Sequence, residues 1–107
     1  MCIRDSPSIQ KVQYKMIGDP TGKLARYFDV MTEEEGSAQR GSFVIDPEGV
    51  IQALEIHADG IGRNAEELVR KVEAAQFVAE HGDQVCPARW HKGAETLKPG
   101  KDLVGTI

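Results

Sequence analysis

The sequence predicts a partial α/β domain with the element order strand, helix, strand, strand, helix, followed by an irregular C-terminal arm. Three observations support this prediction. A turn sequence at 46–49 lies between two short apolar segments, as in a β-hairpin. Apolar side chains then recur at helical spacing between residues 64 and 81. From residue 83 onward the chain has two prolines, three glycines and no clear period.

The composition limits the class of protein. With 107 residues the chain allows one domain with a modest core. The net charge of -4 and the scattered basic residues argue against binding to nucleic acid or anionic membranes. We find no apolar run near the roughly 18 residues of a membrane span and no signal peptide, and two cysteines do not make a secreted disulfide framework. We therefore expect an acidic, cytoplasmic domain.

The first residues do not fit the rest of the chain. Residues 1–6 show no hydrophobic periodicity and join abruptly to the segment that follows. We interpret them as a foreign leader or an assembly error and exclude them from the fold. Cys2 is discounted for the same reason.

A strand and a short helix are expected next. Residues 12–17 alternate weakly between apolar and polar side chains, which indicates a strand. Asp19 is a candidate N-cap and Pro20 a candidate first helical residue. The helix would run over 23–28 and bury three side chains, namely Leu24, Tyr27 and Phe28.

The clearest local signal is the β-hairpin. Residues 42–45 form a continuous apolar run, as expected of a strand buried on both faces. The segment Asp46-Pro47-Glu48-Gly49 has the residue order of a type I turn. Residues 50–56 follow as the second strand.

A longer helix follows a loop over residues 57–62. Asn64 and Glu67 form a capping pair at its start, and Gly82 ends it near His81. Four apolar residues fall on one face: Leu68, Val72, Ala75 and Ala79. Two pairs place an acid four residues before a base, Glu66 with Arg70 and Glu67 with Lys71.

This element order is that of the C-terminal half of a thioredoxin-like fold. From about residue 9 to Ile107 the chain resembles the C-terminal portion of bacterial typical 2-Cys peroxiredoxins of the alkyl hydroperoxide reductase C type. The matching blocks are 16–22, 40–49, 60–63, 85–90 and 102–107. The resemblance divides the chain into a leader (1–8), a half peroxiredoxin domain (9–82) and an arm with a resolving cysteine (83–107).

The resemblance implies reduction of hydrogen peroxide and alkyl hydroperoxides by two cysteines. A peroxidatic thiolate becomes a sulfenic acid, and a resolving thiol from the partner subunit condenses with it to a disulfide. A thioredoxin-like or flavoprotein disulfide reductase recycles that disulfide. The family forms homodimers, often in rings of five dimers, and no cofactor is implied.

Cys86 resembles the resolving cysteine rather than the peroxidatic one, although both motifs contain Val-Cys-Pro. The peroxidatic motif has threonine three residues before its cysteine and proline seven before it, where this chain has Asp83 and Ala79. It also has threonine after the Cys-Pro pair, where this chain has Ala88. A position at the start of an arm, with Trp90 following, fits the resolving role.

Two arginines resemble active-site residues of the family. Arg40 resembles the arginine that faces the peroxidatic sulfur, where a positive charge would lower the thiol pKa. Arg63 resembles a second arginine that supports the first. The motif Pro-x-x-x-Thr-x-x-Cys does not occur in the 107 residues, so we expect the chain to be inactive alone. The alternative is a non-catalytic interaction module that pairs with a full-length subunit.

Three other residue patterns suggest a metal or nucleotide site. His81, Cys86 and His91 recur at five-residue intervals and suggest zinc, but three ligands are too few for a closed structural site. Residues 60–62 have the spacing of a dinucleotide fingerprint without its context, and a loop before a capped helix explains them better. The acidic run at 33–36 fits a solvated loop, with a metal site as the alternative. Two aromatic residues are expected to be packing anchors: Phe77 and Trp90.

Overall fold

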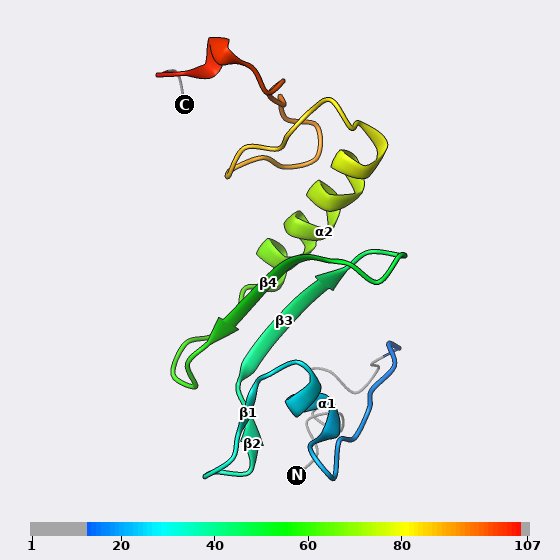
Figure 1. Ribbon diagram of the computed structural model, residues 1–107, viewed down its shortest axis with the longest axis vertical. Coiled ribbons are helices and arrows are strands. Elements are labelled where there is room, and N and C mark those ends of the chain that lie inside the picture. The colour runs from blue at the N-terminus through cyan, green and yellow to red at the C-terminus, as the bar shows by residue number, and fades with distance from the viewer. Residues whose placement is uncertain (1–12, 106–107) are drawn as a thin grey trace.

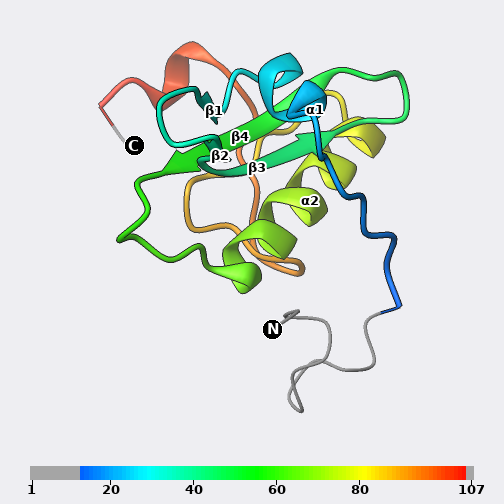
Figure 2. The same cartoon turned by 90° about the horizontal axis from the view of Figure 1, so that it is seen from below.

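The computed structural model of the protein describes residues 13–105. Its elements are α1 (Lys23–Tyr27), β1 (Met31–Thr32), β2 (Ser37–Ala38), β3 (Arg40–Ile45), β4 (Ile51–His57), α2 (Ala65–Glu80) and the 3-10 helix η2 (Lys101–Leu103). The strands form two antiparallel pairs, β1 with β2 and β3 with β4. α2 lies along one side of the β3–β4 hairpin and α1 lies on the other (Figures 1 and 2). No helix in the described segment is both long and apolar enough to cross a membrane.

The β3–β4 hairpin confirms the strongest local prediction. The backbone N–H of Gly49 donates to the Asp46 carbonyl at 3.0 Å, and Gly49 has a φ of 84°, which glycine adopts without strain. The Asp46 carboxylate accepts from the N–H of Glu48 at 3.0 Å and of Val50 at 2.9 Å. The turn is therefore closed by its own first residue.

The two faces of this hairpin have different neighbours. Val44 is buried, and Phe43 packs against Phe28 with ring centroids 4.8 Å apart. Ile45 is 46% exposed, so the predicted burial on both faces is wrong at the end of β3. The reason is that the register shifts between Val44 and Ile45, where the strand runs into the turn.

The ends of α2 lie where the sequence predicts, but the Glu67 carboxylate bonds to Arg70 and does not complete the predicted capping pair. The Asn64 side chain accepts hydrogen bonds from the N–H of Glu66 at 3.0 Å and of Glu67 at 3.3 Å. The helix ends at Glu80, and His81 forms its C-cap. An N-cap depends only on side chains beside the start of the helix, so the local sequence is enough to predict where α2 begins.

The side chains of α2 pair differently from the prediction. Arg70 bonds to Glu67 rather than Glu66, and Lys71 reaches Glu55 on β4. For Lys71, a partner on β4 thus replaces the expected partner on the same helix. The apolar face is also only partly covered, with Val72 36% exposed, because a two-stranded sheet is too narrow to cover a 16-residue helix.

The expected first strand is wrong within the described residues. Residues 13–17 form no strand, and Tyr14 and Ile17 are 72% and 76% exposed. A strand requires hydrogen bonds to a neighbour, and no described segment pairs with this one. Val12 lies outside the described residues, as does Cys2.

α1 forms where the sequence predicts a helix, with changes in detail. Gly22 is the N-cap residue, while the Asp19 carboxylate accepts from the N–H of Leu24 at 3.1 Å and of Ala25 at 3.0 Å. Ala25 is buried, whereas the predicted core residues Leu24 and Tyr27 are 41% and 81% exposed. The helix is five residues long, and Ala25 is its one buried residue.

The acidic run Glu33-Glu34-Glu35-Gly36 forms the turn between β1 and β2. This confirms the prediction of a loop. Glu33 pairs with Arg26 on α1 at 2.7 Å, across side chains that are more than half exposed. Such a pair contributes little to stability and serves mainly to orient the turn.

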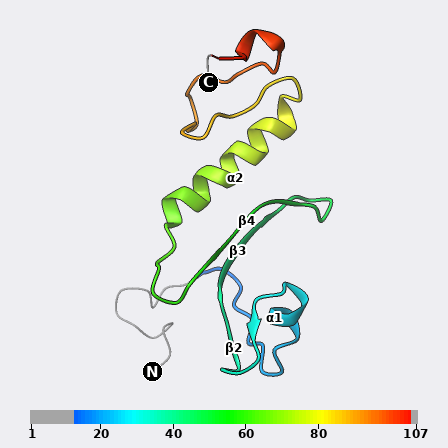
Figure 3. The same cartoon turned by 60° about the vertical axis from the view of Figure 1, so that its left-hand side comes forward.

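The arm extends past the end of α2 (Figures 1 and 3). Val85 and Leu97 form an isolated antiparallel bridge with two backbone hydrogen bonds of 2.8 and 3.0 Å. Trp90 lies inside the loop that this bridge closes and is 2% exposed. The arm is therefore irregular, as predicted, yet held against the helix at one large side chain.

Candidate functional site around Cys86

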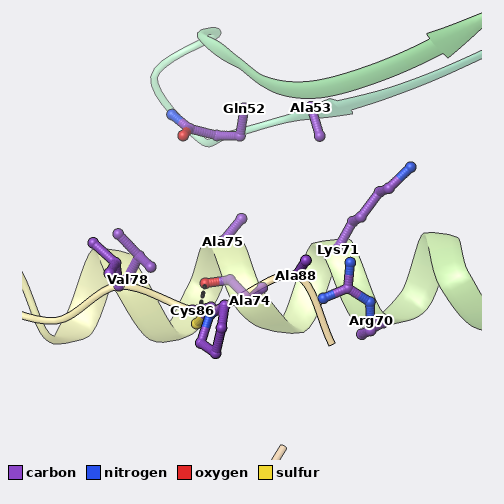
Figure 4. A pocket seen from close by; sticks show the side chains of 11 residues that line it. Gln52, Ala53, Arg70, Lys71, Ala74, Ala75, Val78, Cys86 and Ala88 are labelled. Atoms are coloured by element: carbon purple, nitrogen blue, oxygen red, sulfur yellow. Dashed lines mark hydrogen bonds between the residues drawn. The ribbon is translucent and has the colours of Figure 1, made fainter. Parts of the chain in front are cut away.

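Cys86 follows the bridge residue Val85 and lies beside α2 (Figure 4). Its side chain is half-buried and free, and its Sγ lies 3.9 Å from the Ala74 carbonyl, to which the thiol donates. A cavity of about 340 Å³ between α2 and β4 borders it. The β4 wall of this cavity is formed by Gln52 and Ala53.

Two opposing effects act on the Cys86 thiol. Burial against the helix raises its pKa, because the thiolate loses solvation. The Arg70 guanidinium opposes this effect, since a positive charge stabilises the thiolate. Burial is the larger effect, so the docked thiol is mostly protonated at neutral pH.

Arg70 is itself held on two sides. Its Nε and Nη2 atoms each donate to a Glu67 carboxylate oxygen at 2.7 Å. Its Nη1 atom donates to the Trp90 carbonyl at 3.0 Å. A side chain of α2 is thereby fixed to the arm four residues after Cys86.

Trp90 anchors the arm, as the sequence predicted. Its indole N–H donates to the Ala94 carbonyl at 3.2 Å, and its ring lies 5.2 Å from that of Phe77. The His81 ring stacks on Phe77, with ring centroids 4.1 Å apart. Phe77 and Trp90 thus form the packing contact between the end of α2 and the arm.

The two predicted arginines lie elsewhere. Arg63 Nη1 donates to the Gly41 carbonyl at 2.8 Å and lies 3.4 Å from Ser42 Oγ. Arg40, the first residue of β3, is the register partner of His57. The structure therefore brings the Arg63 side chain to Gly41 and Ser42, the two residues that follow Arg40 in β3. This end of the hairpin adjoins β1 and β2, whereas the arm lies at the far end of α2 (Figure 3).

A charged cluster on the α2-facing side of β4 was not predicted. The Glu55 carboxylate accepts from Lys71 Nζ at 2.9 Å and lies 3.6 Å from His57 Nε2. The Lys71 hydrogen bond is the main cause of the lowered pKa of Glu55. Glu55 and His57 are two positions apart on β4, so the period-two alternation of a strand could have placed them on one face.

Metal ligation finds no support in the described part of the chain. Between residues 13 and 105, no group of three or more His, Cys, Asp or Glu side chains is arranged to hold a metal ion. The rings of His81 and His91 instead lie within hydrogen-bond distance of backbone carbonyls, those of Phe77 and Lys92.

Comparison with known proteins identifies the family. Residues 4–54 match the model of the AhpC/TSA family, and residues 74–104 match the C-terminal domain of 1-Cys peroxiredoxin. Alkyl hydroperoxide reductase C of Staphylococcus haemolyticus is 60% identical over 102 residues, which cover 95% of this chain and 54% of that protein.

Solved structures agree. The crystal structure of Enterococcus faecalis AhpC has a TM-score of 0.72 at 59% identity, covering 78% of this chain and 50% of that one. Reduced Plasmodium vivax 2-Cys peroxiredoxin has a TM-score of 0.74 at 30% identity, covering 80% of this chain and 44% of that one. These likenesses confirm the predicted partial thioredoxin-like α/β fold.

The chain belongs to the peroxiredoxin family. Within that family it is of the alkyl hydroperoxide reductase C type, as the 60% identity to the Staphylococcus haemolyticus protein shows. The chain spans about half the length of the curated relatives it matches.

Proposed function

We propose that this chain is the C-terminal portion of a thiol peroxidase that reduces hydrogen peroxide and alkyl hydroperoxides, and that Cys86 is its resolving cysteine. One observation supports this role above the others. Cys86 is the free cysteine of the described residues, and it lies on an irregular arm rather than inside the β-sheet. A thiol in that position can reach a sulfur on another subunit when the arm moves.

The proposed chemistry balances in two steps. A peroxidatic thiolate attacks ROOH, takes one oxygen and releases the alcohol ROH, or water from hydrogen peroxide. The resulting sulfenic acid then reacts with the Cys86 thiol, so that an S–S bond forms and the S–OH group leaves as water. A thioredoxin-like or flavoprotein disulfide reductase returns both sulfurs to thiols. We place these reactions in the cytoplasm, between the subunits of a homodimer.

Arg40 and Arg63 would act at the peroxidatic sulfur rather than at Cys86. Both arginines are exposed; Arg40 begins β3, and Arg63 donates to the carbonyl of the next residue, Gly41. A positive charge there would lower the pKa of a peroxidatic thiol and stabilise the charge that develops on the peroxide oxygen. The Arg63 hydrogen bond to Gly41 would hold that end of the strand in place.

The test uses a full-length alkyl hydroperoxide reductase C whose own resolving cysteine has been replaced by serine. This protein is mixed with the 107-residue chain carrying Cys2→Ser, and peroxide is added. We expect a disulfide-linked heterodimer on a non-reducing gel. The matched control carries both Cys2→Ser and Cys86→Ser and should give no such band.

One result would overturn the proposal, because the double variant has no cysteine and serves only as the blank for the gel. Absence of the heterodimer with the folded Cys2→Ser chain would show that Cys86 does not resolve a sulfenic acid, and would leave a non-catalytic pairing module.

A further inference from the structure

We propose that Arg70 is a positioning residue for Cys86, which orients the arm through the Trp90 carbonyl and holds a positive charge beside the thiol. This inference rests on the proposed resolving role of Cys86 and deepens it. It assigns a functional task to a residue of α2 that the sequence predicted only as the helical partner of Glu66.

The geometry around Arg70 shows how it could act. Two guanidinium nitrogens are bound to Glu67 at 2.7 Å, which fixes the plane of the group. The remaining Nη1 atom is left to donate to the Trp90 carbonyl on the arm. The Ala74 carbonyl, which accepts from Cys86, lies one helical turn further along the same side of α2. Arg70 and the Ala74 carbonyl that Cys86 contacts thus lie on the same side of α2.

The charged groups around Cys86 leave Arg70 as the relevant one. Two charged residues line the cavity that borders Cys86, namely Arg70 and Lys71, both from α2. The Lys71 ammonium extends toward the strands and is bound to Glu55 at 2.9 Å (Figure 4). β4 and the arm contribute only uncharged residues to the cavity.

The proposed role follows from the chemistry of thiols. The thiolate is the nucleophile, so burial of Cys86 slows its reaction in the docked arm. A fixed positive charge beside the sulfur partly restores the thiolate fraction without releasing the arm. Arg70 therefore keeps the resolving thiol reactive while the arm remains docked.

The test measures alkylation of Cys86 by iodoacetamide in the 107-residue chain with Cys2→Ser, across neutral to alkaline pH. Arg70→Gln should slow alkylation roughly two- to fivefold at neutral pH and displace the pH profile upward. High salt should reduce this difference, because salt screens the charge. Arg70→Lys should restore most of the rate, since it keeps the charge.

Trp90 fluorescence reports whether the arm stays docked in each variant. We expect the arm to stay docked in Arg70→Gln, because the Phe77 contact and the Val85–Leu97 bridge remain, with only a small shift in emission from loss of the contact to the Trp90 carbonyl. If Arg70→Gln does loosen the arm, Glu67→Gln decides, since it keeps the Arg70 charge and should not slow alkylation.

Three results would overturn the inference. They are an unchanged or faster rate in Arg70→Gln with the arm docked, a rate in Arg70→Lys as slow as in Arg70→Gln, and a slower rate in Glu67→Gln. Alkylation needs neither peroxide nor a second subunit. Its outcome is therefore separate from the heterodimer test, which alone decides the resolving role.

Discussion

Replacement of Trp90 tests how the arm is held. Trp90 is 2% exposed, and burial of a tryptophan side chain removes about 150–250 Å² from water, worth roughly 4–6 kcal/mol as an upper bound. Trp90→Ala should therefore destabilise the docked arm by roughly 3–5 kcal/mol, in the range measured for large core truncations. That is enough to release the arm in most molecules.

The assay is the rate of Cys86 alkylation in the Cys2→Ser background. Release of the arm removes the burial that raises the pKa of Cys86, so the rate at neutral pH should rise at least severalfold. Trp90→Phe is the matched control. It keeps a ring against Phe77 and loses the hydrogen bond to Ala94, at a cost of about 1 kcal/mol. An alkylation rate in Trp90→Ala equal to that of the parent chain would refute the anchoring role.

Three further predictions concern stability. Asn64→Ala should cost about 1 kcal/mol in the free energy of unfolding, measured by urea titration, because it removes the N-cap of α2. Gly49→Ala should cost roughly 1–2 kcal/mol in the same titration, because Gly49 has a positive φ, and a loss near zero would contradict the turn geometry. Hydrogen bonds from Val50 N–H and then Gln52 hold the pKa of Asp46 below its ordinary value of 3.8. The contribution of the Asp46 carboxylate to folding stability is therefore complete above that value and is lost as the pH falls below it. Thermal unfolding at acid pH should show this loss of stability, and Asp46→Asn should make the stability depend less on pH.

Local sequence predicted the features that depend on a few neighbouring residues. The turn at Asp46 and Gly49 and the cap at Asn64 each satisfy backbone groups within a few positions of themselves. Such interactions need no knowledge of the rest of the fold, which is why the hairpin and the start of α2 were placed correctly.

Features that depend on distant partners were predicted less well. The alternation of residues 12–17 predicts a strand, although a strand needs a neighbour that no described segment supplies to residues 13–17. Lys71 was paired with a residue on its own helix, whereas Glu55 on β4 is its partner. In both cases the outcome depends on a partner outside the local segment, which is absent for residues 13–17 and present for Lys71.

The candidate site shows the same difference between features that local sequence predicts and features that depend on distant residues. The resemblance identified Cys86, Arg40 and Arg63, and residue types indicated that Trp90 would pack. Neither spacing nor composition could show that Arg63 reaches Gly41 or that Arg70 reaches the Trp90 carbonyl, because the two pairs are 22 and 20 positions apart in sequence.

The central claim is that Cys86 resolves a sulfenic acid and does not attack peroxide itself. The most direct measurement is peroxide consumption by the purified Cys2→Ser chain with thioredoxin, thioredoxin reductase and NADPH supplied. We expect no turnover from this chain alone, and turnover when it is mixed with the full-length relative that lacks a resolving cysteine. Turnover by the chain alone that disappears on Cys86→Ser would contradict the assignment and make Cys86 the peroxidatic residue.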